Sequence, residues 1–471
     1  MASWDRRDRK AQGKVADALL RRQMRDAVGP FSPFWRERLA ALRIRPTAIE
    51  HLADLQRLPA VGERDVCPDG DPRGAARLVL QATEAGFAMH ADGPDLRKAL
   101  VRRIGGKDAY RRQVEAEVRP TTYHFAGNAL RFPVASTRSD LDLMARAGNR
   151  AWRVLGLTGA DVLVSAVPVA ARLDHSALSL AALAAGAPAL FPGDDADAVA
   201  AALRLVPATV LAAPSAGAAA LLGDLAGAGA ELDRIRTVIL VGPASAADRA
   251  GTEESLAAGG ATARVLVLHG PAEGRVLWAE CAPGSGLHTY PDLEVVELLD
   301  PETGENAAAD AGGEVVLTQL GFHGTALVRW RTGDVVETPL DRGACPHCKR
   351  TVPRVSSAVR SGSFVTTLRQ HDGAMRADLR AVASALTGRA DVVDWRIEVR
   401  PAVRTRTDEL IVFVEPRGDD TEAAVGVYRD VRAVAGTAPS QVVVVRGSEL
   451  ADVTGAEWRD SAVSRRIVVR R

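Results

Sequence analysis

The stretch from residue 139 to residue 269 constrains the fold most, because it alternates helix-like segments with short, continuous apolar runs. Five such runs are DVLVSAVPV at 161–169, APALF at 187–191, ATVLAAP at 208–214, TVILVG at 237–242 and RVLVLHG at 264–270. Strands that are apolar on both sides are typical of a parallel sheet with helices on both faces. We therefore predict an α/β fold whose ligands bind beyond the carboxyl ends of these strands. The residues at those ends are Pro168, Pro214, Gly242 and the run 269–273.

The region after residue 276 has a different pattern, which predicts antiparallel strands. LEVVELL at 293–299 and GEVVLTQ at 313–319 flank the turn sequence DPETG. Valine-rich and leucine-rich runs separated by such a turn favour a hairpin. The run ALVRWRTGDVV at 326–336 predicts a further strand that ends on a Thr-Gly-Asp turn, followed by a strand in DVVETP.

The last hundred residues predict a separate small domain. A helix at 375–386 precedes the strands VDWRIEVR and ELIVFVEP, and a helix near 421–434 precedes the strand QVVVVR. This order is typical of a small α+β domain. We expect residues 1–358 to form a large N-terminal domain and residues 359–471 to form a small, mobile C-terminal domain.

The N-terminal part is predicted to be helical. ADALLRRQMRDAV at 16–28 has apolar residues at helical spacing and is expected to end at Gly29 and Pro30. The segment 70–120 is charged and irregular, with one predicted helix from Pro94 to Ile104.

Composition limits the classes of partner and the compartment. The chain has 471 residues, a hydrophobic content of 47% and a formal net charge of +1, so we expect a globular protein with neither nucleic acid nor membrane as a partner. The first ten residues are too polar for a signal peptide, and no apolar run is long and unbroken enough to cross a bilayer. Four cysteines suit a reducing compartment, so a cytoplasmic location is expected.

Cys345 and Cys348 form a Cys-Pro-His-Cys pair, and such a pair outside a thioredoxin-like unit is typical of a metal knuckle. Two thiols are half of a tetrahedral zinc shell. We predict that Cys281 and His288 supply the other half, and that the zinc is structural because four protein ligands leave no open position. His347 competes with His288 for the nitrogen position, and free thiols beside a surface histidine are the alternative.

Several of these runs together resemble the phenylacetate–coenzyme A ligases of the adenylate-forming superfamily. The resemblance is carried by GLHTYPDLEVVELLDPETGE, GGEVVLTQLGFHGTALVRWRTGDVV, the CPHC loop and SPFWRERLAAL near the N-terminus. It implies a large AMP-binding domain, a small rotating domain, and a zinc site at the four residues above. It also implies a ligase that uses ATP with Mg²⁺ and coenzyme A on a small carboxylic acid, and a possible homodimer.

The resemblance assigns roles to residues of two motifs. In the motif from Arg329 to Asp334, Asp334 matches the carboxylate that binds the ribose hydroxyls, with Arg331 in the same cofactor-binding motif. In HGPAE at 269–273, His269 takes the place of an adenine-stacking tyrosine, followed by Gly270. Glu273 matches the magnesium-binding catalytic carboxylate. The alternatives are a turn aspartate at 334 and a helix-start carboxylate at 273.

The sequence departs from the resemblance at the groups that stabilise the α-phosphate. The stretch 124–131 lacks the hydroxyls and glycines of a phosphate loop, and Ala272 stands where a threonine is expected. The last lysine is Lys349, so the catalytic lysine of the small domain has no counterpart, and Arg459 is a poor substitute. At the hinge Arg360, assigned a catalytic role, is present while the aspartate is replaced.

These departures leave two predictions for the function. The first is an AMP-dependent acyl- or aryl-coenzyme A ligase-like protein with impaired or altered adenylation. The alternative is a degenerate relative that keeps the fold, and nucleotide or acyl-ligand binding, without adenylation. Whether the chain is an enzyme stays open at this point, because a shared fold does not itself imply activity.

Overall fold

A computed structural model of the chain describes residues 4–68, 71–83, 85–86, 106–126, 132–168, 173–271, 273–301, 303–361, 365–370, 373–402, 407–446 and 467–469. Several sequence predictions lie outside the described residues. They are the helix at 94–104, the loop residues 127–131, Ala272, the hinge residues 362–363 and Arg459. In the part of the chain that is described, no helix is both long enough and apolar enough to cross a membrane.

The centre of the fold is an eight-stranded sheet, and its parallel half confirms the five predicted strands. These strands are β3 (Leu163–Ser165), β4 (Ala189–Leu190), β5 (Val210–Pro214), β6 (Thr237–Val241) and β7 (Arg264–His269). The sheet order is β13-β9-β8-β7-β6-β5-β3-β4. The antiparallel half consists of β8 (Trp278–Ala279), β9 (Leu287–His288) and β13 (Arg354–Val355). The chain therefore changes from parallel to antiparallel pairing directly after His269.

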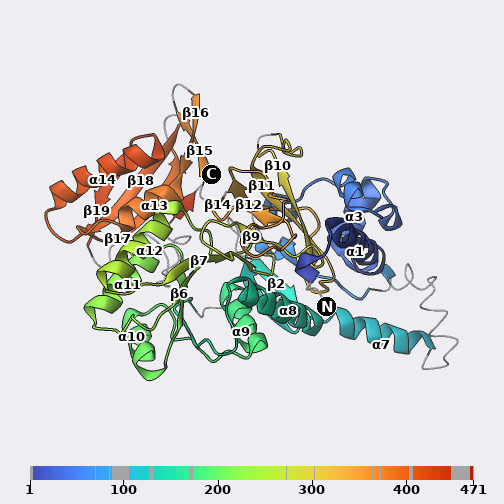
Figure 1. The fold of residues 1–471 in the computed structure, drawn as a ribbon. Coiled ribbons are helices and arrows are strands. Elements are labelled where there is room, and N and C mark those ends of the chain that lie inside the picture. The colour runs from blue at the N-terminus through green and yellow to red at the C-terminus, as the bar shows by residue number, and fades with distance from the viewer. Residues whose placement is uncertain are drawn as a thin grey trace.

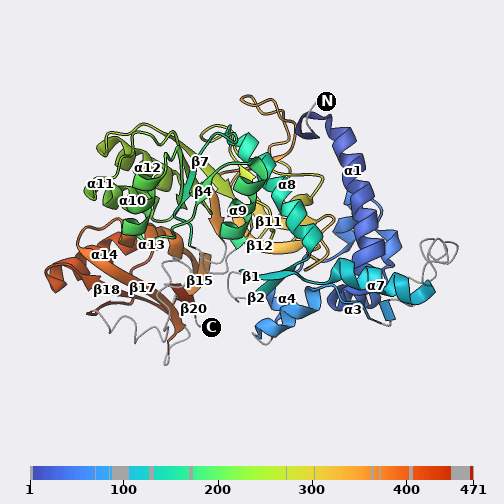
Figure 2. The same cartoon turned by 90° about the horizontal axis from the view of Figure 1, so that it is seen from below.

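Helices cover both faces of this sheet, as the apolar strands require. One group is α8 (Arg138–Val154) and α9 (Leu173–Ala185), and the other is α10 (Ala196–Leu205), α11 (Ala218–Gly227) and α12 (Ala246–Ala258). Figure 2 shows the two groups on opposite sides of β4 and β7. A side chain at Gly148 would place its Cβ 2.6 Å from the Cβ of Ala181, so this glycine lets α8 and α9 pack closely.

A four-stranded antiparallel sheet packs beside the first one, in the order β10-β11-β12-β14. Its strands are β10 (Glu294–Leu299), β11 (Gly313–Gln319), β12 (Trp330–Val336) and β14 (Val359–Ser361). The first two strands coincide with the predicted hairpin, and Gly304 after the turn adopts φ +72°, a conformation that favours glycine. The predicted α/β class with a β-rich subregion is confirmed.

The prediction that Thr332, Gly333 and Asp334 form a turn at the end of a strand was wrong. These residues lie inside β12 and form a bulge, because all three stand opposite the single residue Val315 of β11. Gly333 takes φ +73°, and the Thr332 hydroxyl donates to the Val315 carbonyl at 2.8 Å. A bulge keeps the strand continuous while it re-aims one side chain, here that of Asp334.

The C-terminal part is an α+β unit with its own hydrophobic core around Ile397, Val412 and Val427. It contains β15 (Val365–Gln370), β16 (Gly373–Asp378), α13 (Leu379–Thr387), β17 (Val392–Pro401), β18 (Asp408–Pro416), α14 (Asp420–Ala435), β19 (Gln441–Val444) and β20 (Ile467–Val469). The predicted helix at 375–386 begins only at Leu379, because the residues before it pair with β15 as a hairpin. In Figure 1 this unit lies beside α11 and α12, on the opposite side of the molecule from α1 and α3. The domain boundary at 358 stays a prediction.

The N-terminal helix is longer than predicted. It runs through α1 (Arg9–Arg22), a π-helical segment (Gln23–Val28) and α2 (Gly29–Phe31), so it passes the expected end at Gly29 and Pro30. Gly29 donates to the Met24 carbonyl five residues back. This wider turn accommodates a proline that would break an ordinary helix.

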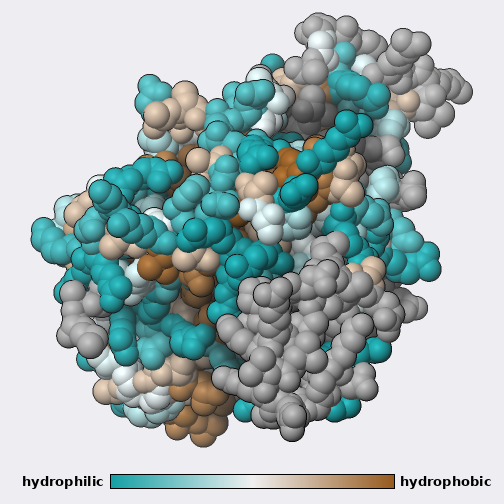
Figure 3. Space-filling model, turned by 90° about the vertical axis from the view of Figure 1, so that its right-hand side faces the viewer, coloured by the Kyte–Doolittle hydropathy of each residue, from teal (hydrophilic) through white to brown (hydrophobic). Residues whose placement is uncertain are grey.

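Shorter elements complete the described part of the chain. They are α3 (Pro33–Ala41), α4 (Glu63–Val66), α7 (Gly106–Val118), β1 (Thr122–Ala126) and β2 (Phe132–Ser136), with short 3₁₀ helices at Trp4–Arg6, Pro46–Ala48, Leu52–Arg57 and Pro72–Leu78. Figure 3 shows the side of the molecule that carries the N-terminal helices. There the coloured atoms are mostly hydrophilic, and hydrophobic groups form small, separate patches. Small patches of this kind are ordinary for a protein surface.

Candidate functional site

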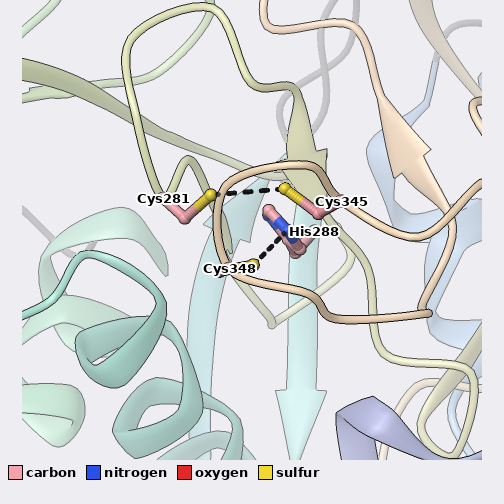
Figure 4. Close-up of side chains that lie close together, drawn as sticks. All are labelled: Cys281, His288, Cys345 and Cys348. Atoms are coloured by element: carbon pink, nitrogen blue, oxygen red, sulfur yellow. Dashed lines mark hydrogen bonds between the residues drawn. The ribbon is translucent and has the colours of Figure 1, made fainter.

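The four predicted metal ligands converge into one cluster. The ligand atoms of Cys281, His288, Cys345 and Cys348 all lie within 4.8 Å of one another. The sulfurs of Cys281 and Cys345 are 3.5 Å apart, and Cys348 Sγ lies 3.2 Å from His288 Nε2. Figure 4 shows these side chains pointing toward a common centre from two loops and a strand. Tetrahedral zinc with Zn–S bonds of about 2.3 Å places its sulfurs about 3.8 Å apart, so the donor set and its spacing fit this ion.

The competition between His288 and His347 is decided by the backbone. His288 is buried in β9, which pairs with β13 directly after the cysteine loop, whereas His347 is exposed. His288 Nδ1 donates to the Ala279 carbonyl at 3.1 Å, so its Nε2 is left as the ligand atom. A metal-binding histidine usually donates its other ring N–H to a backbone carbonyl or a carboxylate in this way, which fixes the orientation of the ring.

The loop also prepares two of its thiols for ionisation. Burial disfavours the thiolate of Cys345, but the backbone N–H groups of Cys348 and His347 outweigh it and lower its pKa. Burial likewise disfavours ionisation of Cys348, and hydrogen bonding from Arg350 reverses the balance and lowers its pKa. Burial raises the pKa of Cys281 to about 12. A divalent cation binds the thiolate form, so the lowered pKa values of Cys345 and Cys348 suit these two residues as metal ligands.

The cysteine loop also anchors the N-terminal segment. Thr351 donates its backbone N–H to the Asp5 carbonyl at 2.8 Å, and Arg6 donates to the Cys348 carbonyl at 3.2 Å. The Asp5 carboxylate pairs with Arg150 of α8 and with Arg350 of the loop. The cluster is therefore tied to two distant parts of the chain.

A second group of polar side chains lies where the two sheets meet. His269, the last residue of β7, is buried and donates from Nε2 to Asp334 Oδ2 at 3.0 Å. Asp334 belongs to β12 of the other sheet and is only 5% exposed. Its backbone N–H donates to the Thr332 hydroxyl at 3.1 Å, which holds the bulge in place. The fold thus brings together two predicted cofactor-binding residues that are 65 positions apart.

Glu273 lies close to this pair and is more deeply buried than either of its members. It is 1% exposed, and its Oε2 has no hydrogen-bond partner among the described residues. Burial, reinforced by the nearby acids Glu63 and Asp334, raises the pKa of Glu273 to about 8. The Trp330 indole N–H opposes this rise, although it too completes no hydrogen bond in the described structure. Glu273 lies in a turn rather than at the start of a helix.

An unpartnered, buried carboxylate oxygen among acids is a suitable ligand for a hard cation such as Mg²⁺. Two members of this environment, Glu63 and Trp330, were missed in the sequence. The only available signal for Trp330 was its place in the motif with Asp334, and nothing in the local sequence pointed to Glu63. Val61 forms an isolated parallel β-bridge with Trp330 of β12, and this bridge brings the nearby Glu63 toward the same region.

The remaining predicted residues have other immediate contacts. Arg331 donates from Nε to Glu314 Oε2 at 2.9 Å, so its guanidinium is engaged within the sheet. A side chain at Gly270 would place its Cβ 2.2 Å from the Val276 carbonyl oxygen, so this position needs glycine for packing. Arg360 lies in β14, with its Cα opposite Val335 of β12. The backbone at the predicted hinge is therefore the next strand beyond Asp334.

The carboxyl ends of the parallel strands meet at one edge, as predicted for ligand-binding residues. Gly242 after β6 donates to the Leu268 carbonyl at 3.0 Å, and the Ser215 hydroxyl after β5 donates to the Pro243 carbonyl. Strand order reverses between β3 and β5, which is the switch point at which α/β sheets bind ligands. Near the end of β3, the His175 ring makes an edge contact with Phe191 at 5.0 Å between centroids.

Solved structures with the same fold give this arrangement a context. A 2-hydroxyisobutyryl-CoA ligase in the postadenylation state, in complex with R3-HIB-AMP, has a TM-score of 0.67 and 16% identity. The match covers 99% of this chain and 91% of that one. The same ligase with 2-HIB-AMP and CoA in the thioesterification state has a TM-score of 0.60 at 16% identity, again over 99% and 91% of the two chains. McyG A-PCP complexed with phenylalanyl-adenylate has a TM-score of 0.53 at 12% identity, over 75% and 70%.

This chain has the adenylate-forming fold. No protein-family profile matches the sequence, and no curated protein matches it. Within the adenylate-forming fold, the Cys–His cluster and the His269–Asp334–Glu273 group occupy separate places. We call them the metal cluster and the carboxylate group below. The resemblance to the phenylacetate–coenzyme A ligases in particular stays a prediction.

Proposed function

We propose that the protein is an AMP-dependent acyl- or aryl-coenzyme A ligase-like protein that acts on a small carboxylic acid. The carboxylate group, at the carboxyl end of β7 in an adenylate-forming fold, carries this proposal. Asp334 would bind the ribose of ATP. Glu273 would bind Mg²⁺, which would neutralise phosphate charge. Arg360, on the neighbouring strand, would act in catalysis at the junction with residues 359–471, our proposed mobile domain.

The small carboxylic acid would bind at the switch point between β3 and β5. His175 lies near the end of β3, and burial, the dominant influence on its ring, lowers its pKa below the usual value. Its Nδ1 is buried without a partner among the described residues. A neutral imidazole there offers a polar contact beside an otherwise apolar strand end, which suits a compact acid rather than a long acyl chain.

The metal cluster would hold a structural zinc ion. Its four protein ligands fill a tetrahedral shell, so no position is left for substrate or water. The ion would join the loop at Cys281 to the loop at Cys345, and through them the N-terminal segment. A homodimer stays a prediction that gel filtration can check.

AMP release tests the proposed function. The purified chain would be incubated with ATP, Mg²⁺, coenzyme A and a panel of aryl, acyl and amino acids, and AMP would be quantified by chromatography. We expect slow AMP release that requires both the acid and coenzyme A, and that Asp334→Ala abolishes. AMP release that is independent of the acid, or unaffected by Asp334→Ala, would contradict the proposal.

A second function, ligand binding without adenylation, is favoured by one specific observation. The chain contains no lysine after Lys349, so the lysine that would stabilise the α-phosphate has no counterpart among residues 350–471. A transition state that accumulates charge on the α-phosphate needs fixed cations and donors, and losing one typically costs roughly 10²–10³ in rate. Binding of AMP or acyl-CoA without any AMP release would establish this second function.

A further inference from the structure

The ribose-binding carboxylate of the proposed function already has a partner within the protein. His269 Nε2 lies 3.0 Å from Asp334 Oδ2, and each residue is 5% exposed. No other side chain donates to the Asp334 carboxylate among the described residues. The bond is buried, so water does not weaken it as it would at the surface.

The bulge in β12 fixes the backbone at Asp334. Its backbone N–H is held by the Thr332 hydroxyl, whose own proton goes to the Val315 carbonyl. Gly333 N–H donates to Glu314 Oε1 at 3.2 Å, which fixes the other side of the bulge. The backbone bonds therefore hold Asp334 beside the end of β7, where its carboxylate contacts the imidazole of His269.

We propose that His269 is an internal competitor of the nucleotide, so that the ribose hydroxyls engage Asp334 only after the His269–Asp334 hydrogen bond breaks. The proposal rests on the proposed nucleotide site and adds a determinant of its affinity. Asp334 is 5% exposed and the imidazole of His269 lies against its Oδ2, so two neighbouring ribose hydroxyls reach this carboxylate only when the ring moves away. Each binding event then exchanges one hydrogen bond for two instead of adding two.

This competition has a consequence that a purely structural bond lacks. If the bond only tied β7 to β12, its loss would lower stability and leave nucleotide affinity unchanged or weaker. If it competes, its loss should raise affinity, and the gain should depend on the ribose hydroxyls. Loss of the hydrogen bond therefore raises nucleotide affinity while it lowers the stability of the fold only if His269 competes with the nucleotide.

Titration calorimetry of the full chain with AMP and with 2′,3′-dideoxy-AMP measures this directly. His269→Phe keeps an aromatic ring but removes the donor. We expect it to bind AMP about tenfold more tightly than the wild type, which corresponds to about 1.4 kcal/mol. Binding of dideoxy-AMP should not change, because that nucleotide offers Asp334 nothing. His269→Gln keeps a donor and should stay close to the wild type.

His51→Phe is the matched control, because His51 also faces an aspartate, Asp17 at 3.3 Å, but on the surface. It should leave both affinities unchanged. Thermal melting would verify that the variants fold, and His269→Ala would replace His269→Phe if the ring strains the site.

The outcomes separate the proposal from the function on which it rests. Equal AMP affinity for the wild type and the donor-free variant overturns the competition and leaves the nucleotide site intact. A gain for dideoxy-AMP as large as that for AMP overturns it as well. Absence of AMP binding in every protein overturns both the competition and the proposed nucleotide site.

Discussion

The metal cluster and the carboxylate group are both sets of buried polar side chains, but they differ in what remains available. In the metal cluster, His288 gives Nδ1 to a backbone carbonyl and keeps Nε2 facing the sulfurs. In the carboxylate group, His269 donates from Nε2 to Asp334, and one oxygen of Glu273 has no hydrogen-bond partner in the described part of the chain. In our proposal a cation would complete the first set, whereas in the second set two side chains already bond to each other. A residue can therefore be present in a motif while its side chain is already hydrogen-bonded to another part of the protein.

The largest expected effect concerns the metal cluster. Cys345→Ser should remove the zinc and lower the free energy of unfolding by at least about 5 kcal/mol, because structural zinc binding contributes directly to folding. Elemental analysis and urea unfolding would measure the two effects. Cys67→Ser is the matched control, since Cys67 is equally buried at 3% exposure but lies outside the cluster. Equal zinc content in the two variants would refute the metal assignment.

A smaller effect on stability is expected from Glu273, the buried acid of the carboxylate group. The pKa of Glu273 is about 8 in the folded chain and near its ordinary value of 4.5 in the unfolded chain. The unfolded chain therefore loses the proton first, and stability falls as the pH rises through that window. From pH 5.5 to pH 8 this amounts to about 3 kcal/mol, which Glu273→Gln should abolish.

Urea unfolding of both proteins at the two pH values would measure that difference. Glu294, whose pKa burial also raises to about 8, contributes to both proteins alike. Glu280→Gln serves as control: it strips Arg249 of its buried partner and should destabilise the chain at both pH values. A pH-independent effect of Glu273→Gln would show that its carboxyl group does not titrate between the two values.

The smallest effect concerns the link between the metal cluster and the N-terminal segment. Asp5→Ala breaks the pairs with Arg150 and Arg350 and should cost about 1–2 kcal/mol without changing the zinc content. Arg73→Ala removes an exposed pair with Asp71 and should change stability by less than about 0.5 kcal/mol. Loss of zinc from Asp5→Ala would mean that the N-terminal segment is part of the metal site rather than anchored to it.

The metal cluster could be predicted from the sequence because cysteine is rare in this chain. With four cysteines and one close pair, few ligand sets were possible, and His288 follows Cys281 by seven residues. The hairpin of β10 and β11 was equally accessible, since two apolar runs flank a turn sequence that ends in a glycine. Local pattern and local geometry agree in both cases.

The carboxylate group could be predicted only in part. The motif identified Asp334, but the sequence indicated a turn there, because the bulge depends on the register between β11 and β12. His269 was interpreted as a weak stacking residue. Its bond to Asp334 depends on how two sheets pack, and no local pattern encodes that distance. The hairpin of β15 and β16 was missed for a related reason, since 375–378 has helical spacing but pairs with a preceding strand.

We propose that the protein combines a complete set of metal ligands with a carboxylate group that supports adenylation poorly. ATP–pyrophosphate exchange by the zinc-loaded protein tests this most directly, with a motif-complete adenylate-forming enzyme as the reference and a panel of aryl, acyl and amino acids. The missing phosphate-loop groups, threonine and lysine would together reduce the stabilisation of the transition state by several kcal/mol, and about 1.4 kcal/mol corresponds to a factor of ten in rate. We therefore expect exchange at least about 10³-fold slower than the reference with every acid. Exchange at the rate of the reference with any acid would contradict the account.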